Sequence, residues 1–327
     1  MNILVTGGAG FIGSNFVHYM LENHPDYKII NLDLLTYAGN IHNLDDVMEN
    51  PNHVFVQGNI NNRELVRNLV KTYDINQFVN FAAESHVDRS ILNPEIFVET
   101  NIQGTLALLD VAKELNINKY LQVSTDEVYG SLGAEGYFTE ETPLAPNSPY
   151  SASKTGADLL VRSYFETYGM NVNITRCSNN YGPYHFPEKL IPLMITNGMD
   201  NKDLPIYGDG LNIRDWLHVQ DHCQAIDLVL HKGRKGEVYN IGGHNERTNN
   251  QIVEIIIEKL GLSNDLIKYV EDRLGHDKRY AIDPTKLETE LGWKPKYTFD
   301  TGIVETIDWY QANEAWWRPL KERANLN

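Results

Sequence analysis

The chain has 327 residues, enough for one large domain or two closely joined ones, and 42% of them are hydrophobic. Asp and Glu number 44 against 28 Lys and Arg, so the formal net charge is -16. A field of that sign repels nucleic acid, and no nucleic-acid partner is expected. The two cysteines, Cys177 and Cys223, are too few for a disulfide framework and suit a reducing compartment.

The sequence carries no pattern typical of a membrane or export segment. No apolar run approaches the length that spans a bilayer. An apolar strand pattern begins directly at Asn2, which leaves no space for a signal peptide. We therefore expect a cytoplasmic protein without a membrane partner.

Short apolar runs alternate with helical patterns through the first half of the chain. The predicted strands cover residues 3–6, 28–32, 54–57, 77–81, 120–124 and 172–175, and predicted helices between them include 12–22, 63–72 and 102–115. This alternation is typical of an α/β fold with a doubly wound, parallel Rossmann sheet.

The rhythm changes after Arg176, where Pro and Gly become frequent. We expect irregular structure there that closes over a cleft, then one more sheet strand at 238–241. Helices are predicted at roughly 249–260, 284–291 and 300–313. The predicted division is a Rossmann domain of residues 1–176 plus about 218–246, and a smaller C-terminal domain of residues 177–217 plus 247–327.

A glycine-rich segment follows the first predicted strand and opens the first predicted helix. The spacing of Gly7, Gly10 and Gly13 allows a tight turn, close approach of backbone N–H groups to a pyrophosphate, and close packing of helix on strand. Asp33 lies 20 residues after Gly13, at the end of the second strand. A carboxylate there accepts hydrogen bonds from the adenosine ribose and repels a 2′-phosphate, so the Rossmann domain is predicted to bind NAD rather than NADP.

Tyr150 and Lys154 are four residues apart near the start of a predicted helix, so they share one helix face. A tyrosine is a weak base at neutral pH, and a nearby lysine ammonium lowers the pKa of the phenol by stabilising the phenolate. Lys154 could also hydrogen-bond the nicotinamide ribose. Such pairs also occur on ordinary helix surfaces, but downstream of a dinucleotide turn this one indicates a catalytic pair.

Thr125, Asp126 and Glu127 end a predicted strand at the carboxyl edge of the sheet, where ligands bind in such folds. The Thr125 hydroxyl is suited to orienting a substrate hydroxyl. Hydride transfer needs a single base, whereas elimination of water needs both a base and an acid. Two carboxyl groups in one closed site can have very different pKa values, so that one is protonated while the other is ionised. These residues favour a dehydration step over an ordinary acidic loop.

Motifs along nearly the whole chain resemble the dTDP-glucose 4,6-dehydratase family, whose members are extended short-chain dehydrogenase/reductases. The matching segments are Thr6–Gly13, Leu35–Asn40, Ala82–Ser90, Ser124–Gly130, Tyr150–Lys154, Cys177–Pro192, Arg214–Val219 and Tyr239–Asn245. The long Cys177–Pro192 segment is far more specific than the glycine turn.

The resemblance implies a hydro-lyase with tightly bound NAD and a nucleotide-sugar substrate. Tyr150 would take the proton of the glucose 4-hydroxyl while C4 gives hydride to NAD, and Thr125 would hold the substrate near O4. Glu127 would then remove the C5 proton and Asp126 would protonate the departing 6-hydroxyl, before hydride returns to C6. The product would be a 4-keto-6-deoxy sugar, as used in deoxysugar biosynthesis such as that of rhamnose.

Further contact residues are implied by the resemblance. For NAD they are Gly7, Gly10, Phe11, Ile12, Gly13, Asp33, Leu34, Leu35, Thr36, Asn59, Ile60, Phe81, Ala82, Ala83, Thr100, Tyr150, Lys154 and Asn180. For the sugar nucleotide they are Ser85, Thr125, Asn179, Lys189, Leu190, Pro205, Ile206, Tyr207, Arg214, Asn249, Asp272, Arg273 and His276. Arg214 suits a forked clamp on a pyrophosphate, while Lys189 also fits a solvated surface lysine and His276 a structural loop residue. No metal ion is expected in the site.

Other functions are compatible with the same residues. A nucleotide-sugar 4-epimerase would use the same Tyr–Lys pair and NAD without an elimination pair. A nucleotide-glucuronate decarboxylase would need a cationic pocket for a C6 carboxylate. A non-catalytic NAD-sensing regulator could share the fold, because fold alone does not determine function.

The resemblance also implies a homodimer formed through two helices of each subunit, at 102–115 and at the helix that carries Tyr150. Leu34, Asn59 and Leu274 depart from residues that are frequent in the family, which bears on cofactor and base contacts. The preferred nucleotide base is not determined by the sequence.

Overall fold

The computed structural model describes residues 1–324, and its larger unit is built on a seven-stranded parallel sheet of order β10-β6-β5-β4-β1-β2-β3. The strands are β1 (Asn2–Thr6), β2 (Lys28–Asp33), β3 (His53–Gln57), β4 (Gln77–Asn80), β5 (Lys119–Thr125), β6 (Val172–Cys177) and β10 (Val238–Ile241). The seven predicted strands are confirmed. Strand order reverses between β1 and β4, and this is where ligands enter such sheets.

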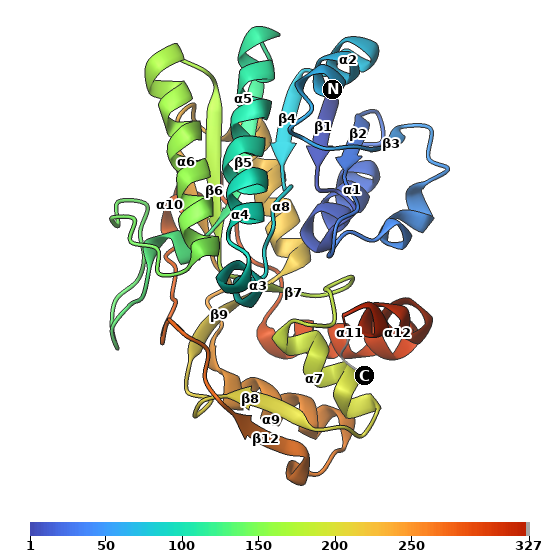
Figure 1. Cartoon of the computed structure of the whole chain (residues 1–327), viewed down its shortest axis with the longest axis vertical. Helices are drawn as coiled ribbons and strands as arrows, with labels where there is room; N and C mark the ends of the chain where they lie inside the picture. The colour runs from blue at the N-terminus through green and yellow to red at the C-terminus, as the bar shows by residue number, and fades with distance from the viewer. Residues whose placement is uncertain (325–327) are drawn as a thin grey trace.

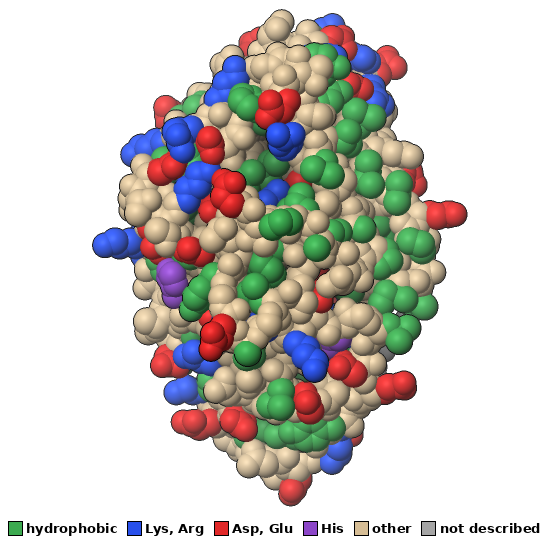
Figure 2. All heavy atoms as spheres, turned by 90° about the vertical axis from the view of Figure 1, so that its left-hand side faces the viewer, with side chains coloured by type: hydrophobic (Ala, Val, Ile, Leu, Met, Phe, Trp, Pro, Cys, Tyr) green, Lys and Arg blue, Asp and Glu red, His purple; other side chains and the backbone are tan. Residues whose placement is uncertain are grey.

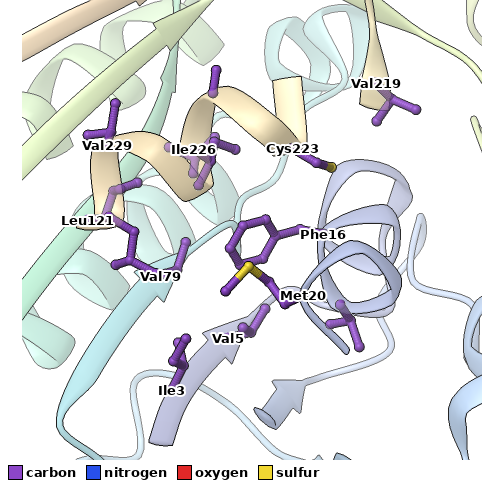
Figure 3. Close-up of a cluster of buried hydrophobic side chains, with 14 of the residues drawn as sticks. Ile3, Val5, Phe16, Met20, Val79, Leu121, Val219, Cys223, Ile226 and Val229 are labelled. Atoms are coloured by element: carbon purple, nitrogen blue, oxygen red, sulfur yellow. The ribbon is translucent and has the colours of Figure 1, made fainter. Parts of the chain in front are cut away.

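Helices cover both faces of the sheet, because a parallel sheet buries both. One face carries α1 (Phe11–Asn23), α8 (Val219–Lys232) and α10 (Thr285–Leu291), and the other carries α2 (Arg63–Tyr73), α5 (Gly104–Glu114) and α6 (Pro149–Tyr168). Figure 3 shows the core of the first face, where Ile3 and Val5 of β1 meet Phe16 and Met20 of α1 and Ile226 of α8. Each such burial contributes about 1.5–3 kcal/mol, so this core holds α1 and the turn before it against the sheet.

Short helical segments link these elements. They are α3 (Val87–Leu92), α4 (Glu95–Phe97), the wide π-helical turn η2 (Val98–Gln103), and the 3₁₀ segments η1 (Ile41–Val47), η3 (Asp126–Tyr129) and η4 (Asn264–Leu266). The predicted helix at 102–115 therefore continues a helical path that starts earlier, through α4 and η2.

A smaller unit lies below the sheet in Figure 1. It contains β7 (Asn179–Tyr181), β8 (Leu204–Tyr207), β9 (Ile213–His218), β11 (Glu246–Thr248), β12 (Ile267–Val270), α7 (Leu190–Met199), α9 (Asn249–Leu260), α11 (Phe299–Ala312) and α12 (Glu314–Arg323). Its strands form a three-stranded sheet, β11-β9-β7, and a two-stranded one, β12-β8. Tyr181, Ile256, Ile303 and Trp317 are among the buried residues of its core.

The expectation of irregular structure after Arg176 is confirmed only in part, for segments such as residues 182–189 and 208–212, which form turns and bends. The same stretch also contains β7, α7, β8 and β9, followed by α8. Pro192 does not interrupt α7, because it lies in the first turn, where a backbone N–H has no intrahelical partner. The helix α8 was also missed, although Cys223, Ile226 and Leu230 repeat at helical spacing and are buried.

The predicted domain division stays a prediction, with one observation that bears on it. Leu287 and Trp293 belong to the sequence range assigned to the smaller domain, yet they pack in the core between the sheet and α8. Within residues 1–324, no helix has the length and apolar character needed to cross a bilayer.

Candidate active site

A cavity of about 750 Å³ lies between the carboxyl edge of the large sheet and the smaller unit. Most residues predicted to contact cofactor line it: Gly7, Gly10, Phe11, Ile12, Gly13, Asp33, Leu34, Thr36, Asn59, Ile60, Phe81, Ala82, Ala83, Thr100, Tyr150, Lys154 and Asn180. So do most predicted substrate contacts: Ser85, Thr125, Asn179, Lys189, Leu190, Pro205, Tyr207, Arg214, Asn249, Arg273 and His276, together with Glu127. A cavity of this size suits ligands larger than a simple alcohol.

Four predicted site residues do not line the cavity. Leu35 packs its side chain against the core of the sheet. Ile206 is buried in the smaller unit, because alternate residues of β8 point to opposite sides and only Pro205 and Tyr207 face the cavity. Asp272 is exposed and binds His276, with its Oδ1 2.6 Å from Nδ1. Asp126 is buried behind the cavity wall.

The glycine turn joins β1 to α1 with little free space around it. Gly7 has φ +71°, and a Cβ there would lie 2.6 Å from the backbone nitrogen of Ala82. A Cβ on Gly13 would lie 2.2 Å from the Gly7 carbonyl oxygen. At Gly10 the nearest protein atom to such a Cβ would be 3.4 Å away, and this residue faces the cavity. The turn therefore leaves the start of α1 open to an anionic ligand.

Asp33 is held at the carboxyl end of β2 by the backbone. Its Oδ2 accepts a hydrogen bond from the Ala9 N–H at 2.9 Å, and its Oδ1 accepts one from the Leu35 N–H at 2.7 Å. Burial raises the pKa of this carboxyl, and the two backbone donors oppose the rise. The carboxyl links the glycine turn to β2 and has further lone pairs toward the cavity, as a ribose contact requires.

Tyr150 and Lys154 stand on the first turns of α6, one helical turn apart. A capping box between Ser148 and Ser151 begins this helix, with Pro149 at its first position. The backbone N–H of Tyr150 also donates to the Ser90 hydroxyl at 3.1 Å. These contacts fix the direction in which the Tyr150 side chain enters the cavity.

Thr125, Asp126 and Glu127 follow β5 and open η3. The Thr125 hydroxyl caps this segment by accepting a hydrogen bond from the Glu127 N–H at 3.2 Å, and its side chain lies beside the Tyr150 hydroxyl. Burial, followed by the charges of Glu127 and Asp215, raises the pKa of Asp126 well above its usual value. Among residues 1–324, the Oδ2 atom of Asp126 has no hydrogen-bond partner. These surroundings favour the protonated form of the Asp126 carboxyl.

Glu127 meets a different environment. Burial raises its pKa as well, but Arg214, Lys189 and Arg273 oppose that rise. Three cations thus stabilise the ionised carboxylate of Glu127. For Asp126, Arg214 favours ionisation, and the charges of Glu127 and Asp215 oppose it. The two adjacent carboxyls are suited to opposite tasks, with Asp126 as the acid and Glu127 as the base.

The expected effect of Lys154 on Tyr150 differs from the arrangement observed. Burial and then the Glu127 charge raise the pKa of Tyr150 well above its usual value. The Lys154 ammonium donates to the Val123 carbonyl at 2.9 Å, and burial lowers the pKa of Lys154. Burial away from water disfavours both the Tyr150 phenolate and the Lys154 ammonium. The phenol therefore needs a further positive charge close to it before it can act as a base.

Cationic and aromatic side chains meet at the end of the cavity formed by the smaller unit. The Arg214 guanidinium stacks 4.2 Å above the Tyr280 ring and donates to the backbone carbonyl of Asp277 at 2.8 Å. Arg273 lies 4.9 Å from the Tyr207 ring centre. Lys189 is not a free surface lysine, because its Nζ donates to the Ser85 carbonyl at 3.2 Å inside the cavity. This end is suited to the phosphates of a nucleotide.

The sequence reasoning missed several polar residues that line the cavity. Glu188 accepts a hydrogen bond from the Tyr37 hydroxyl at 2.5 Å and lies 3.5 Å from His86 Nε2. The Arg89 guanidinium lies 3.9 Å from the Tyr37 ring centre. Tyr37, His86, Arg89 and Glu188 all lie within the motif segments of the sequence, and that membership was the available signal. Their spacing along the chain did not indicate that they come into contact.

A model of the family described as GDP-mannose 4,6 dehydratase matches residues 4–306 of the chain. A dTDP-glucose 4,6-dehydratase of Xanthomonas campestris is 52% identical over 96% of this chain and 94% of its own length. A crystal structure of dTDP-glucose 4,6-dehydratase from Bacillus anthracis, in complex with NAD, is 59% identical with a TM-score of 0.93, over 98% of this chain and 100% of that one.

A UDP-glucose 4-epimerase structure from Thermotoga maritima has a similar fold, with a TM-score of 0.89, and covers 96% of this chain and all of its own. Its sequence identity is only 29%, about half that of the dehydratase structure. Shared architecture thus extends to the epimerases, while sequence identity separates them from the dehydratases. The chain belongs to the GDP-mannose 4,6 dehydratase family and, within it, to the dTDP-glucose 4,6-dehydratases.

Proposed function

We propose that the protein is an NAD-dependent hydro-lyase that converts dTDP-glucose into dTDP-4-keto-6-deoxyglucose and water. The observation that carries the proposal is the pair Asp126 and Glu127, placed beside Tyr150 with opposite electrostatic surroundings. An epimerase or a simple dehydrogenase has no use for an acid and a base of this kind. The product would serve deoxysugar formation, such as that of rhamnose.

In the oxidation step, the residues of the chain orient the sugar and move one proton. Thr125 holds the 4-hydroxyl beside Tyr150, which removes its proton. Lys154 would hold the cofactor ribose. NAD, when bound, supplies the positive nicotinamide ring whose charge the phenolate needs, takes hydride from C4 and later returns it to C6. The glycine turn fits its pyrophosphate and Asp33 fits its ribose hydroxyls.

In the elimination step, the 4-keto group makes the C5 proton acidic. Glu127 removes that proton, for which its carboxylate must be ionised. Asp126 lies just behind the cavity wall, so its side chain would turn toward the cavity when substrate binds and give its proton to the 6-hydroxyl, which leaves as water. The buried position and unpartnered Oδ2 of Asp126 support this role, since both favour the protonated form.

The two units would divide the ligands between them. The Rossmann domain of residues 1–176 plus about 218–246 would hold NAD, and the domain of residues 177–217 plus 247–327 would hold the nucleotide. Lys189, Tyr207, Arg214 and Asn249 of the second domain line the cavity and support this assignment.

We also infer a homodimer formed through the helices in front of the sheet in Figure 1. Exposed apolar side chains gather there on α3, α4, η2 and α6: Ile91, Leu92, Ile96, Val98 and Leu159. Leu92 is 86% exposed. Figure 2 shows the face seen from the left of that view, with hydrophobic side chains gathered along its right-hand border, toward these helices. Exposed apolar side chains gathered on neighbouring helices are typical of an interface.

The test is an assay of the purified chain with NAD and glucose linked to thymidine, uridine, cytidine and guanosine diphosphates. The expected result is a 4-keto-6-deoxy product from the thymidine-linked sugar, detected by its absorbance in alkali. Formation of the 4-epimer without that product would overturn the dehydratase assignment. Formation of the product from a sugar linked to another nucleotide, and not from the thymidine-linked sugar, would contradict the proposed substrate.

A further inference from the structure

A second cluster of ionisable side chains lies outside the cavity, where α1 ends against α8. It consists of His24, Asp227 and His231, whose potential ligand atoms all lie within 4.8 Å of one another. His24 Nε2 is 3.0 Å from both carboxylate oxygens of Asp227. His231 Nδ1 is 2.9 Å from Asp227 Oδ1. Two imidazoles therefore converge on one carboxylate.

The fold brings these three residues together from two helices. Asp227 and His231 are four residues apart on α8, so they share one face. His24 follows the last residue of α1. The apolar cluster of Figure 3 locks α1 onto α8 through Phe16, Met20 and Ile226, and this rigid contact fixes the distance between the two histidines.

Neighbouring groups hold the imidazole rings in place. The Tyr27 hydroxyl lies 2.8 Å from His231 Nε2, which turns Nδ1 toward Asp227. The Tyr27 ring also stacks on His24, with centroids 4.5 Å apart and planes inclined by 9°. Partners that fix the orientation of a histidine from its far side are typical of metal ligands.

The charge at the cluster is suited to a cation. Asp227 supplies a carboxylate whose oxygens lie within hydrogen-bond distance of both imidazoles. The nearby cation Lys119 is directed elsewhere, because its Nζ donates to the backbone carbonyls of Val229 and Gly233. The side chains of all three cluster residues are between 14% and 25% exposed, so solvent reaches the cluster.

We propose that His24, Asp227 and His231 bind one divalent transition-metal ion of the zinc class, with water completing the coordination. Two imidazole nitrogens and one carboxylate oxygen suit Zn²⁺ and its neighbours, whereas Mg²⁺ and Ca²⁺ prefer oxygen ligands. Ligand bonds of about 2.0–2.2 Å to a tetrahedral ion place ligand atoms about 3.3–3.6 Å apart, which is slightly farther than each imidazole nitrogen lies from the Asp227 carboxylate here and within the 4.8 Å that spans the cluster. Binding releases the proton that His231 Nδ1 shares with Asp227.

The ion would act on stability and not on the reaction. The helix α1 has 13 residues, so its end lies about 20 Å from the glycine turn. A metal at that end would tie α1 to α8, which both cover the same face of the sheet, and would leave the cavity residues untouched. Bound metal therefore raises the melting temperature of the full-length protein without changing its turnover.

The experiment measures zinc binding to the full-length protein by equilibrium dialysis and its melting temperature with and without Zn²⁺. Variants His24→Gln, Asp227→Asn and His231→Gln remove one ligand each. His42→Gln is the matched control, because His42 pairs with Asp45 at 3.1 Å on an exposed segment. Wild type and control should bind one zinc per chain, with a rise in Tm of about 4 °C at 100-fold excess over Kd. Each ligand variant should bind at least about tenfold more weakly.

Equal zinc affinity in His24→Gln and the wild type would overturn the proposal, and so would weaker binding in His42→Gln. Dehydratase activity of each variant shows whether it is folded. If the ligand variants fail to fold, Co²⁺ added to the wild type decides the matter. An intense visible spectrum of four-coordinate cobalt supports the site, and the weak spectrum of hydrated cobalt overturns it.

Discussion

Asp126 and Glu127 are neighbours in the chain, yet their carboxyl groups meet different surroundings. Asp126 is enclosed and raised in pKa by burial and by the charges of Glu127 and Asp215. Glu127 faces the cavity, where Arg214, Lys189 and Arg273 oppose the effect of burial. A one-residue step along η3 therefore separates a carboxyl whose surroundings favour the protonated form from one whose ionised form is stabilised by three cations.

The kinetic consequence is that Asp126→Asn should slow elimination far more than oxidation. An amide cannot protonate the leaving hydroxyl, so water loss should fall by about 10²–10⁴-fold, while the Tyr150 step keeps its groups. Rapid mixing with dTDP-glucose should then show NADH accumulating by absorbance. Asp45→Asn, at an exposed position, is the control. An equal fall of both steps would show that Asp126 is not the acid.

Asp126 should also reduce the free energy of unfolding at neutral pH. Its pKa is raised in the folded state, so the stability it contributes is present below the unfolded value of about 3.8 and declines as pH rises toward the folded value. An asparagine cannot ionise, so Asp126→Asn abolishes this pH-dependent loss of stability and should raise the Tm by about 2–4 °C at pH 7. The gain should shrink near pH 4. Thermal unfolding at both pH values checks this, and a gain independent of pH contradicts it.

Among the elements, the turn between β1 and α1 is the most constrained by sterics. Gly13 lets α1 pass close to the Gly7 carbonyl, since a Cβ would lie 2.2 Å from that oxygen. The strand before the turn and the helix after it are both held by the core shown in Figure 3. Neither β1 nor α1 can move away without exposing buried apolar side chains, so the turn itself must shift if a side chain is added at Gly13.

Gly13→Ala should therefore weaken NAD binding by at least about tenfold, because overpacking of a tight contact costs about 1–3 kcal/mol. Gly133→Ala is the matched control, since a Cβ at Gly133 would have no neighbour within 4 Å in the described part of the chain. Titration of the stripped protein with NAD gives the affinity of each variant. Unchanged affinity in Gly13→Ala would show that the turn does not approach the cofactor.

Several elements could not be read from local pattern. In α7, the proline in the first turn resembles a helix breaker in sequence, and only its position relative to the helix start makes it harmless. The strands β7, β8 and β9 have three to six residues each, and their pairing partners are distant in sequence. Short strands of this kind are stabilised by tertiary contacts more than by their own composition.

At the scale of the whole molecule, the apolar surface on α3, α4, η2 and α6 predicts the oligomeric state. The wild type should elute with the mass of a dimer in size-exclusion chromatography with light scattering. Leu92→Arg should give a monomer, because it places a charge among the exposed apolar side chains proposed to form the interface. Leu211→Arg, an exposed leucine in the loop between β8 and β9, should remain a dimer. A dimeric Leu92→Arg protein would place the interface elsewhere.

The sequence by itself determined the sheet, the glycine turn, Asp33, the Tyr150 and Lys154 pair and the Thr125 to Glu127 segment. Each of these is a local pattern, set by the period of strand and helix or by the backbone freedom of glycine. The tertiary structure decided which side chains meet. It directs Ile206 away from the cavity, brings Glu188 to Tyr37, and encloses Asp126.

The cluster of His24, Asp227 and His231 shows the same division. The sequence separates His24 from Asp227 by 203 positions, and nothing in their spacing suggests a ligand set. They meet only because α1 and α8 pack on the same face of the sheet. Burial and charge depend on such long-range neighbours, so the pKa values that separate acid from base in the active site were likewise settled only by the folded chain.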